Sequence, residues 1–172
     1  MKTLIAYSSK TGSTKKIAEK LKEYANEAIM YDINQKDDIT LADFEHIYVL
    51  GWIDKGTYNK EALDFANSIS NKKVSFIFTL GAYPNSMHAY DCIENIKKVL
   101  VENNNEVISF WHCQGPIDPK LIEWMKNLDP SHGHAVDKSR ELRWADAANH
   151  PNQEDYNSLF GFYSLTNKKL EN

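Results

Sequence analysis

Short apolar runs alternate along the chain with stretches whose apolar residues recur at helical spacing. The runs are short and nearly continuous, which predicts strands buried on both faces. They occupy residues 3–7, 28–33, 46–51, 73–80 and 106–113. Between them, apolar positions three and four residues apart predict helices over residues 14–28, 60–69 and 86–102. The polar stretch 34–43 is expected to hold one helical turn.

Five strands that alternate with helices predict one parallel sheet covered by helices on both faces, with right-handed crossovers. Ligands of such sheets bind beyond the carboxyl ends of the strands, where the strand order reverses. The segments at these ends are 8–14, 51–59, 80–86 and 113–118. We therefore expect the functional residues in these four segments.

The last third of the chain adds helices without a further strand. Short helices are predicted over 119–128 and 139–149, separated by a loop over 129–138. Asn152 is predicted to cap a last helix that runs to about residue 169. The chain shows no repeat or linker, so a single domain over 1–172 is expected, in which residues 113–150 form an insertion between the fifth strand and the last helix.

Composition and charge argue against several classes of function. The 172 residues are 42% hydrophobic with a formal charge of −4, which fits one globular domain and argues against a nucleic-acid partner. No apolar run approaches the roughly 20 residues that cross a bilayer, and the start of the chain lacks a signal-peptide layout. We expect a cytoplasmic protein without membrane insertion. Cys92 and Cys113 have no C-x-x-C spacing and are expected to be free thiols, and the positions of the arginines exclude a Cys-x5-Arg phosphatase loop.

The turn after the first strand is the strongest candidate for chemistry. Residues 8–14 offer five hydroxyls and one glycine directly before a helix. Unpaired N–H groups and the helix dipole favour an anion there, and hydroxyls add donors, which predicts a site for a phosphate ester. The alternative is a turn and helix cap only. Neither G-x-x-x-x-G-K-[ST] nor G-x-G-x-x-G fits, so a Walker A loop and a dinucleotide fingerprint are excluded.

This turn resembles the phosphate loop of flavodoxins, which follows the pattern [ST]-x-T-G-x-T. The order of elements over residues 2–113 is also similar to that family. The resemblance implies a doubly wound, five-stranded α/β sheet of strand order 2-1-3-4-5, FMN as the cofactor, and one-electron transfer. The matching phosphate-loop residues are Ser9, Lys10, Thr11, Gly12, Ser13 and Thr14.

Two further loops are similar to the family's flavin loops. In the first, a glycine carbonyl accepts a hydrogen bond from N5–H of the reduced ring, and Gly56 matches that glycine. Lys55 stands where many flavodoxins place Trp or Met, and Trp52 is expected either to replace that ring or to pack in the core. The candidate residues of this loop are Trp52, Ile53, Asp54, Lys55 and Gly56.

The second loop follows the fourth strand. Tyr83 matches the aromatic residue that covers the outer face of the flavin, and its alternative is an ordinary surface tyrosine. The candidate residues are Thr79, Leu80, Gly81 and Tyr83. No acid–base catalytic residue is implied, because the cofactor performs the redox step. His132 and His134 lack an evident third ligand, so no metal site is predicted.

The resemblance implies an electron carrier that receives electrons from a reductase and delivers them to a partner redox enzyme. Two alternatives stay open: an FMN-dependent NAD(P)H:quinone oxidoreductase, and a flavodoxin-like binding module without cofactor. Lys10 and Lys55 are expected to raise the flavin's reduction potential if they lie close to it, or to point into solvent. Residues 113–150 are expected to form a docking surface or partial lid, or only to bury Trp124 and Trp144.

Overall fold

A single sheet forms the centre of the computed structural model, which describes residues 1–35 and 38–172. Five parallel strands lie in the order β2-β1-β3-β5-β6, which confirms the predicted order once the short β4 is set aside. Each long strand is an apolar run whose ladder hydrogen bonds pair its backbone inside the protein. The strands are β1 Thr3–Tyr7, β2 Ile29–Asp32, β3 His46–Asp54, β4 Thr57–Tyr58, β5 Lys73–Leu80 and β6 Glu106–Gln114.

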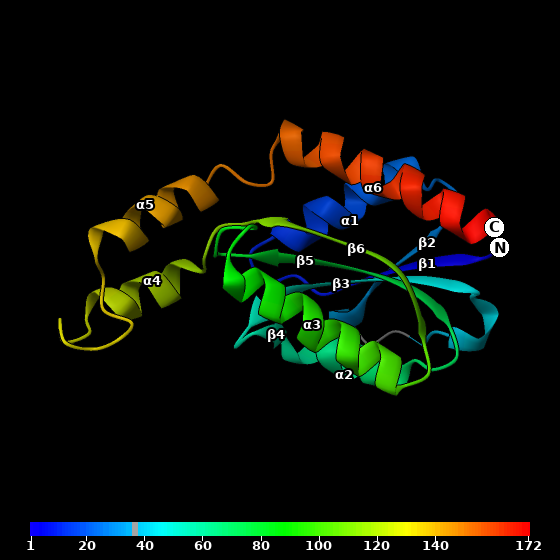
Figure 1. The fold of residues 1–172 in the computed structure, drawn as a ribbon, viewed down its shortest axis with the longest axis horizontal. Helices are drawn as coiled ribbons and strands as arrows, with labels where there is room; N and C mark the ends of the chain where they lie inside the picture. Colours follow the sequence, from blue (N-terminus) through cyan, green and yellow to red (C-terminus); the bar gives the residue numbers. More distant parts are fainter. Residues whose placement is uncertain (36–37) are drawn as a thin grey trace.

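Helices cover both faces of the sheet, as predicted (Figure 1). α1 (Ser13–Tyr24) and α6 (Gln153–Glu171) lie on one face, and α2 (Lys60–Ser68) and α3 (Met87–Glu102) lie on the other. Successive strand residues point to opposite faces. Ile5 and Tyr48 therefore join the core under α1 and α6, whereas Leu4 and Val49 join the core under α2 and α3. Two short 3-10 turns, Ile33–Gln35 and Leu41–Asp43, lie between β2 and β3, where one helical turn was expected over 34–43; residues 36–37 of that stretch lie outside the described residues.

The third strand differs from its prediction. Instead of ending at Gly51 it runs on to Asp54 and turns back as β4, with Ile53 opposite Tyr58 in antiparallel register. Lys55 (φ 51°) and Gly56 (φ 84°) both have left-handed backbone conformations, as a type I′ hairpin turn requires. The segment 51–59 is therefore a hairpin rather than an open loop. Asn-Gly or Asp-Gly normally signals such a turn, and Lys-Gly does not.

The helix boundaries shift by a few residues. α1 ends at Tyr24, four residues earlier than predicted, and a turn closed by Ala28 N–H on the Ala25 carbonyl (2.9 Å) leads into β2. α3 begins at Met87, because the side chain of Ser86 caps it from outside. Over residues 1–35 and 38–172, every helix is too short or too polar to cross a lipid bilayer.

Two helices separate β6 from α6. α4 (Pro119–Lys126) and α5 (Lys138–Ala147) lie beyond the carboxyl ends of the strands, at the opposite end of the molecule from both termini (Figure 1). Trp144 is buried, with 8% of its surface exposed, whereas Trp124 is 50% exposed. Packing therefore accounts for Trp144 but leaves half of Trp124 in solvent.

A buried line of polar side chains crosses the sheet near the amino ends of its strands. His46 Nε2 lies 3.0 Å from Ser75 Oγ, and Ser109 Oγ lies 2.9 Å from Ser75 Oγ and 2.7 Å from Thr166 Oγ1. His46 has no exposed surface. These hydrogen bonds join β3, β5, β6 and α6 inside the apolar core.

β6 is an edge strand of the sheet. Its Phe110 is half-exposed but stacks on Phe76 of β5, with ring centroids 5.4 Å apart. The ammonium group of Lys169 on α6 donates to the carbonyl of Ile108 at 3.1 Å. The outer edge of β6 is therefore partly occupied by a side chain of its own molecule.

Candidate cofactor site

The phosphate-loop candidate wraps around the start of α1. Gly12 is the N-cap residue, with φ 96°, and a Cβ there would meet nothing within 4 Å. Glycine is thus favoured by the backbone conformation rather than by crowding. Lys15 N–H donates to Ser9 Oγ at 3.2 Å, and the N–H groups of Ser13 and Thr14 have no partner within the helix. These backbone donors provide a cradle for an anion.

The hydroxyls of this loop divide into two kinds. Thr14 is buried, and its Oγ1 lies 2.9 Å from Thr79 Oγ1 at the end of β5. Ser8 is also buried and donates to Asn34 Oδ1 at 3.1 Å. Both therefore connect the loop to neighbouring elements. Thr11, by contrast, lines an open cleft.

A cleft of about 480 Å³ lies at the carboxyl ends of the strands, where the sheet topology places a ligand. It brings the first loop, the hairpin and the loop after β5 together, as predicted. Its lining is mostly apolar with charged side chains from Lys10, Asp54, Lys55 and Asp118, which suits a flat ring joined to a charged tail. The lining residues are Lys10, Thr11, Trp52, Ile53, Asp54, Lys55, Thr79, Leu80, Gly81, Gly115, Pro116, Ile117, Asp118 and Leu121.

Asn59, which the sequence analysis did not single out, fixes the hairpin against the first loop. Its side chain is buried. Its Oδ1 accepts from Trp52 N–H at 3.1 Å, and its Nδ2 donates to Ser8 Oγ at 2.8 Å and to Glu61 Oε2 at 2.9 Å. Asn59 directly precedes α2, but its side chain makes no capping hydrogen bond, so the N-cap preference of Asn does not signal this role.

The segment after β6, the fourth of the segments expected at the carboxyl ends of the strands, forms a further wall of the cleft, although none of its residues was a named candidate. A Cβ on Gly115 would lie 3.3 Å from Ser13 Cβ, so this glycine allows close packing against the first loop. A Cβ on Gly81 would lie 2.5 Å from Ile117 Cγ1, so Ile117 packs directly onto the loop after β5. Ile117 and Leu121 therefore add an aliphatic surface to the cleft.

Tyr83 lies outside the residues that line the cleft. Its hydroxyl donates to Asp146 Oδ2 on α5 at 2.7 Å, and 40% of its surface is exposed. This hydrogen bond and the nearby carboxylate raise the pKa of Tyr83. The stacking role stays a prediction, and it requires the ring to turn from α5 toward the cleft.

Gly56 is held from the side of α3. Asn95 Nδ2 donates to the Gly56 carbonyl oxygen at 2.9 Å. A rotation of the peptide after Gly56 would therefore have to break this hydrogen bond. Lys55, next to it, lines the cleft.

Lys10 reaches from the first loop to the opposite wall. Its Nζ lies 2.7 Å from Asp118 Oδ2 and 5.7 Å from the centroid of the Trp52 ring. The ammonium group holds the pKa of the Asp118 carboxyl below its usual range, so this side chain stays ionised. The pairing offsets the positive charge that was expected to raise a flavin's potential, which leaves Lys55 as the remaining candidate for that effect.

The residues at the end of β6 serve packing. His112 stacks on Phe78 with centroids 4.8 Å apart, and its Nε2 lies 2.9 Å from the Pro84 carbonyl oxygen. Burial raises the pKa of the Cys113 thiol, which disfavours the nucleophilic thiolate. Cys92 and Cys113 are both free and buried, as expected.

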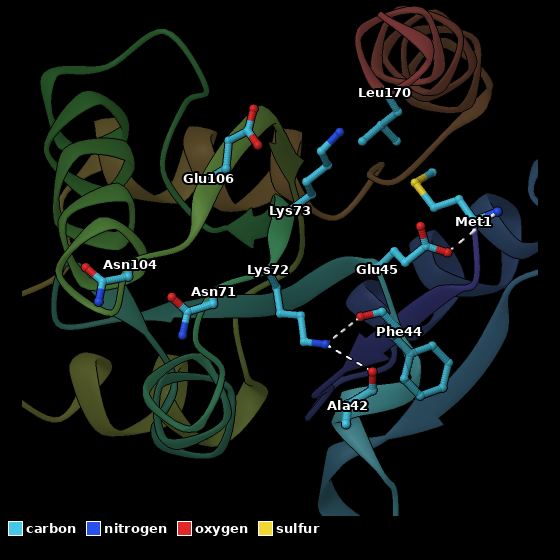
Figure 2. Close-up of a pocket in the computed structure, with 10 residues that line it drawn as sticks. All are labelled: Met1, Ala42, Phe44, Glu45, Asn71, Lys72, Lys73, Asn104, Glu106 and Leu170. Carbon is cyan, nitrogen blue, oxygen red and sulfur yellow. Dashed lines mark hydrogen bonds and ion pairs between the residues drawn. The ribbon is translucent and has the colours of Figure 1, made fainter.

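A larger cavity of about 650 Å³ lies at the opposite, amino end of the strands (Figure 2). None of the predicted site residues lines it. Lys72 Nζ donates to the carbonyls of Ala42 and Phe44, and the carboxylate of Glu45 lies 3.8 Å from the amino group of Met1. Since several of its charged groups are paired within the protein, we place the functional site at the carboxyl end.

Comparison with known proteins agrees with this arrangement. The flavodoxin domain model matches residues 4–164. The flavodoxin-like domain-containing protein BilS of Clostridioides difficile is 29% identical over 161 residues, a match that covers 90% of each chain. Oxidised flavodoxin 1 of Bacillus cereus superposes with a TM-score of 0.61 at 15% identity over 98% of each chain. The Fusobacterium nucleatum flavodoxin bound to flavin mononucleotide gives a TM-score of 0.58 at 11% identity over 99% of each chain.

The family model spans most of the chain and includes the first loop, the hairpin and the loop after β5. The two solved flavodoxin structures share the fold of this protein over nearly their whole length. The protein therefore belongs to the flavodoxin family.

Proposed function

We propose that the protein binds FMN in the cleft at the carboxyl ends of its strands and carries single electrons between a reductase and a partner redox enzyme. The observation that carries the proposal is the cleft itself, which Lys10 and Thr11 of the loop before α1 line together with the hairpin, the loop after β5 and the segment after β6. The helix that follows this loop has no side-chain cap on its first N–H groups. The flavodoxin of Fusobacterium nucleatum and a flavoprotein of Lactobacillus acidophilus with the same fold are both bound to FMN.

The residues present fit the parts of this cofactor. The phosphate would sit on the N–H groups at the start of α1, with the loop hydroxyls around it, among residues Ser9, Lys10, Thr11, Gly12, Ser13 and Thr14. The ring would lie between the walls formed by Trp52, Ile53, Asp54 and Lys55 on one side and Thr79, Leu80 and Gly81 on the other. Gly56, at the hairpin turn, and Tyr83, which would have to turn from α5, are the remaining candidates for contact with it. Bound FMN would supply the redox chemistry, and the protein would orient it and exclude water.

Exposed apolar side chains at the same end of the molecule support a protein partner. Trp124 and Leu121 on α4 and Met87 and Tyr90 at the start of α3 are each about half-exposed or more. Large apolar side chains in solvent often mark contact surfaces. We propose the insertion 113–150 as part of the surface that docks the partner.

A second candidate is an FMN-dependent NAD(P)H:quinone oxidoreductase. The aliphatic wall formed by Ile117 and Leu121 favours it, because this wall makes the cleft suitable for a small apolar acceptor as well. Binding of a quinone would then require space beside the flavin ring.

Purified protein separates the candidates. Titration with FMN should quench flavin fluorescence, and stepwise anaerobic reduction should proceed in two resolved one-electron steps without rapid NAD(P)H oxidation. Rapid NAD(P)H oxidation in the presence of a quinone would favour the oxidoreductase instead. A protein that is colourless and does not associate with added FMN would refute both and leave a binding module without cofactor.

A further inference from the structure

The Lys10–Asp118 pair lines the cleft. Lys10 belongs to the loop that we assign to the phosphate, and Asp118 belongs to the segment after β6. The Nζ–Oδ2 distance of 2.7 Å is that of a direct charge-assisted hydrogen bond. The carboxylate of Asp118 is therefore already bound to the ammonium group of Lys10, in the same loop whose backbone N–H groups we assign to the phosphate.

The two partners differ in mobility. Asp118 is the N-cap of α4, where its Oδ1 accepts from Lys120 N–H at 2.9 Å, and only 18% of its side chain is exposed. The preceding Ile117 is packed against Gly81. Lys10 has 57% of its side chain exposed and a flexible stem, so Lys10 is the group that can move.

A phosphate monoester carries more negative charge than one carboxylate, about −1.5 to −2 at neutral pH. Lys10 is more than half exposed, and an ion pair that solvent reaches contributes little to stability, so the exchange of one anion for the other has a small cost. After the exchange, Asp118 stands without its lysine near a second anion. The loss of the Lys10–Asp118 pair and the repulsion between Asp118 and the phosphate both weaken the binding of the phosphate. Neither effect acts on the uncharged flavin ring.

We propose that Lys10 exchanges Asp118 for the phosphate of bound FMN, so that Asp118 weakens the binding of phosphorylated flavin relative to riboflavin. This inference rests on the proposed function. Asp118 is thereby a positioning residue, because it acts on the ligand through Lys10. Its presence sets the preference between two flavins that differ only in the phosphate.

Asp118→Asn tests the proposal, since Asn caps a helix as well as Asp does and removes only the charge. FMN and riboflavin are titrated separately into the cofactor-free protein and followed by flavin fluorescence. FMN affinity should rise about two- to fivefold, the range expected for an exposed charge pair, and riboflavin affinity should not change. The FMN gain should shrink at high salt.

The matched control is Asp137→Asn, which changes the N-cap of α5, where Asp137 accepts from Arg140 N–H at 2.7 Å. It should leave both affinities unchanged. In a Lys10→Met background, Asp118→Asn should lose most of its effect on FMN. An equal gain for riboflavin, no gain for FMN, or a full gain without Lys10 would overturn the exchange while FMN binding stands. If no variant binds FMN at all, the proposed function fails as well.

Discussion

Acid should destabilise the protein through one buried histidine. Burial and the charge of Lys73 lower the pKa of His46 to about 4, whereas an unfolded chain has a histidine pKa of about 6.5. Below pH 6.5 His46 is protonated in the unfolded chain but stays neutral in the folded protein. The free energy of unfolding therefore falls as the pH drops from about 6.5 to about 4. Each pKa unit corresponds to about 1.36 kcal/mol, which gives a loss of about 2 kcal/mol by pH 5 and about 3 kcal/mol by pH 4.

Urea unfolding followed by circular dichroism at pH 7 and pH 5 measures this loss. His46→Gln removes the titrating ring, so the variant should lose about 2 kcal/mol less than wild type between the two pH values. Ser75→Ala is the control, because it removes the hydrogen-bond partner of His46 and leaves the imidazole buried. It should be less stable at both pH values and keep the wild-type pH dependence. Equal pH dependence in wild type and His46→Gln would refute the reasoning.

Three further variants probe the site. Gly81→Ala should push Ile117 into the cleft and weaken FMN binding about tenfold in a fluorescence titration, and Ile117→Ala added to it should restore part of the affinity. Asn95→Ala frees the Gly56 carbonyl to turn toward the flavin, so spectroelectrochemistry should show a first-electron potential about 40 mV higher, equivalent to about 1 kcal/mol; an unchanged potential would contradict that role. Tyr83→Phe removes the bond to α5 and should lower the melting temperature by about 2–4 °C without abolishing FMN binding.

The local pattern of the chain was sufficient for most of the fold. β1 and β5 have the predicted bounds, because each is a run of buried residues that ends at a polar or glycine-containing turn. β3 was predicted too short, since Trp52 continues the strand by pairing with Thr79 of β5, and Ile53 and Asp54 continue it by pairing with β4. That pairing depends on a left-handed conformation at Lys55, which its residue type does not signal.

The candidate residues that line the cleft come from loops with a recognisable local pattern. Residues that reach the cleft from the distant segment after β6 were not named as candidates. Lys10 and Trp52 line the cleft, as the loop patterns indicated. Ile117 and Asp118 lie in the segment 113–118, which was expected near the site, but neither was a named candidate, because only the tertiary structure brings them against Gly81 and Lys10. Contacts between residues so far apart in the chain leave no periodic signal in either segment.

Lys169, beside the edge strand β6, disfavours association of the protein with other copies through that strand. An edge strand can accept a strand from another molecule and so begin aggregation. Lys169 already donates to the carbonyl of Ile108, and a strand arriving at β6 would have to displace its ammonium group from this hydrogen bond. The sheet is therefore poorly suited to grow by addition of a foreign strand at this border, even though Phe110 is exposed there.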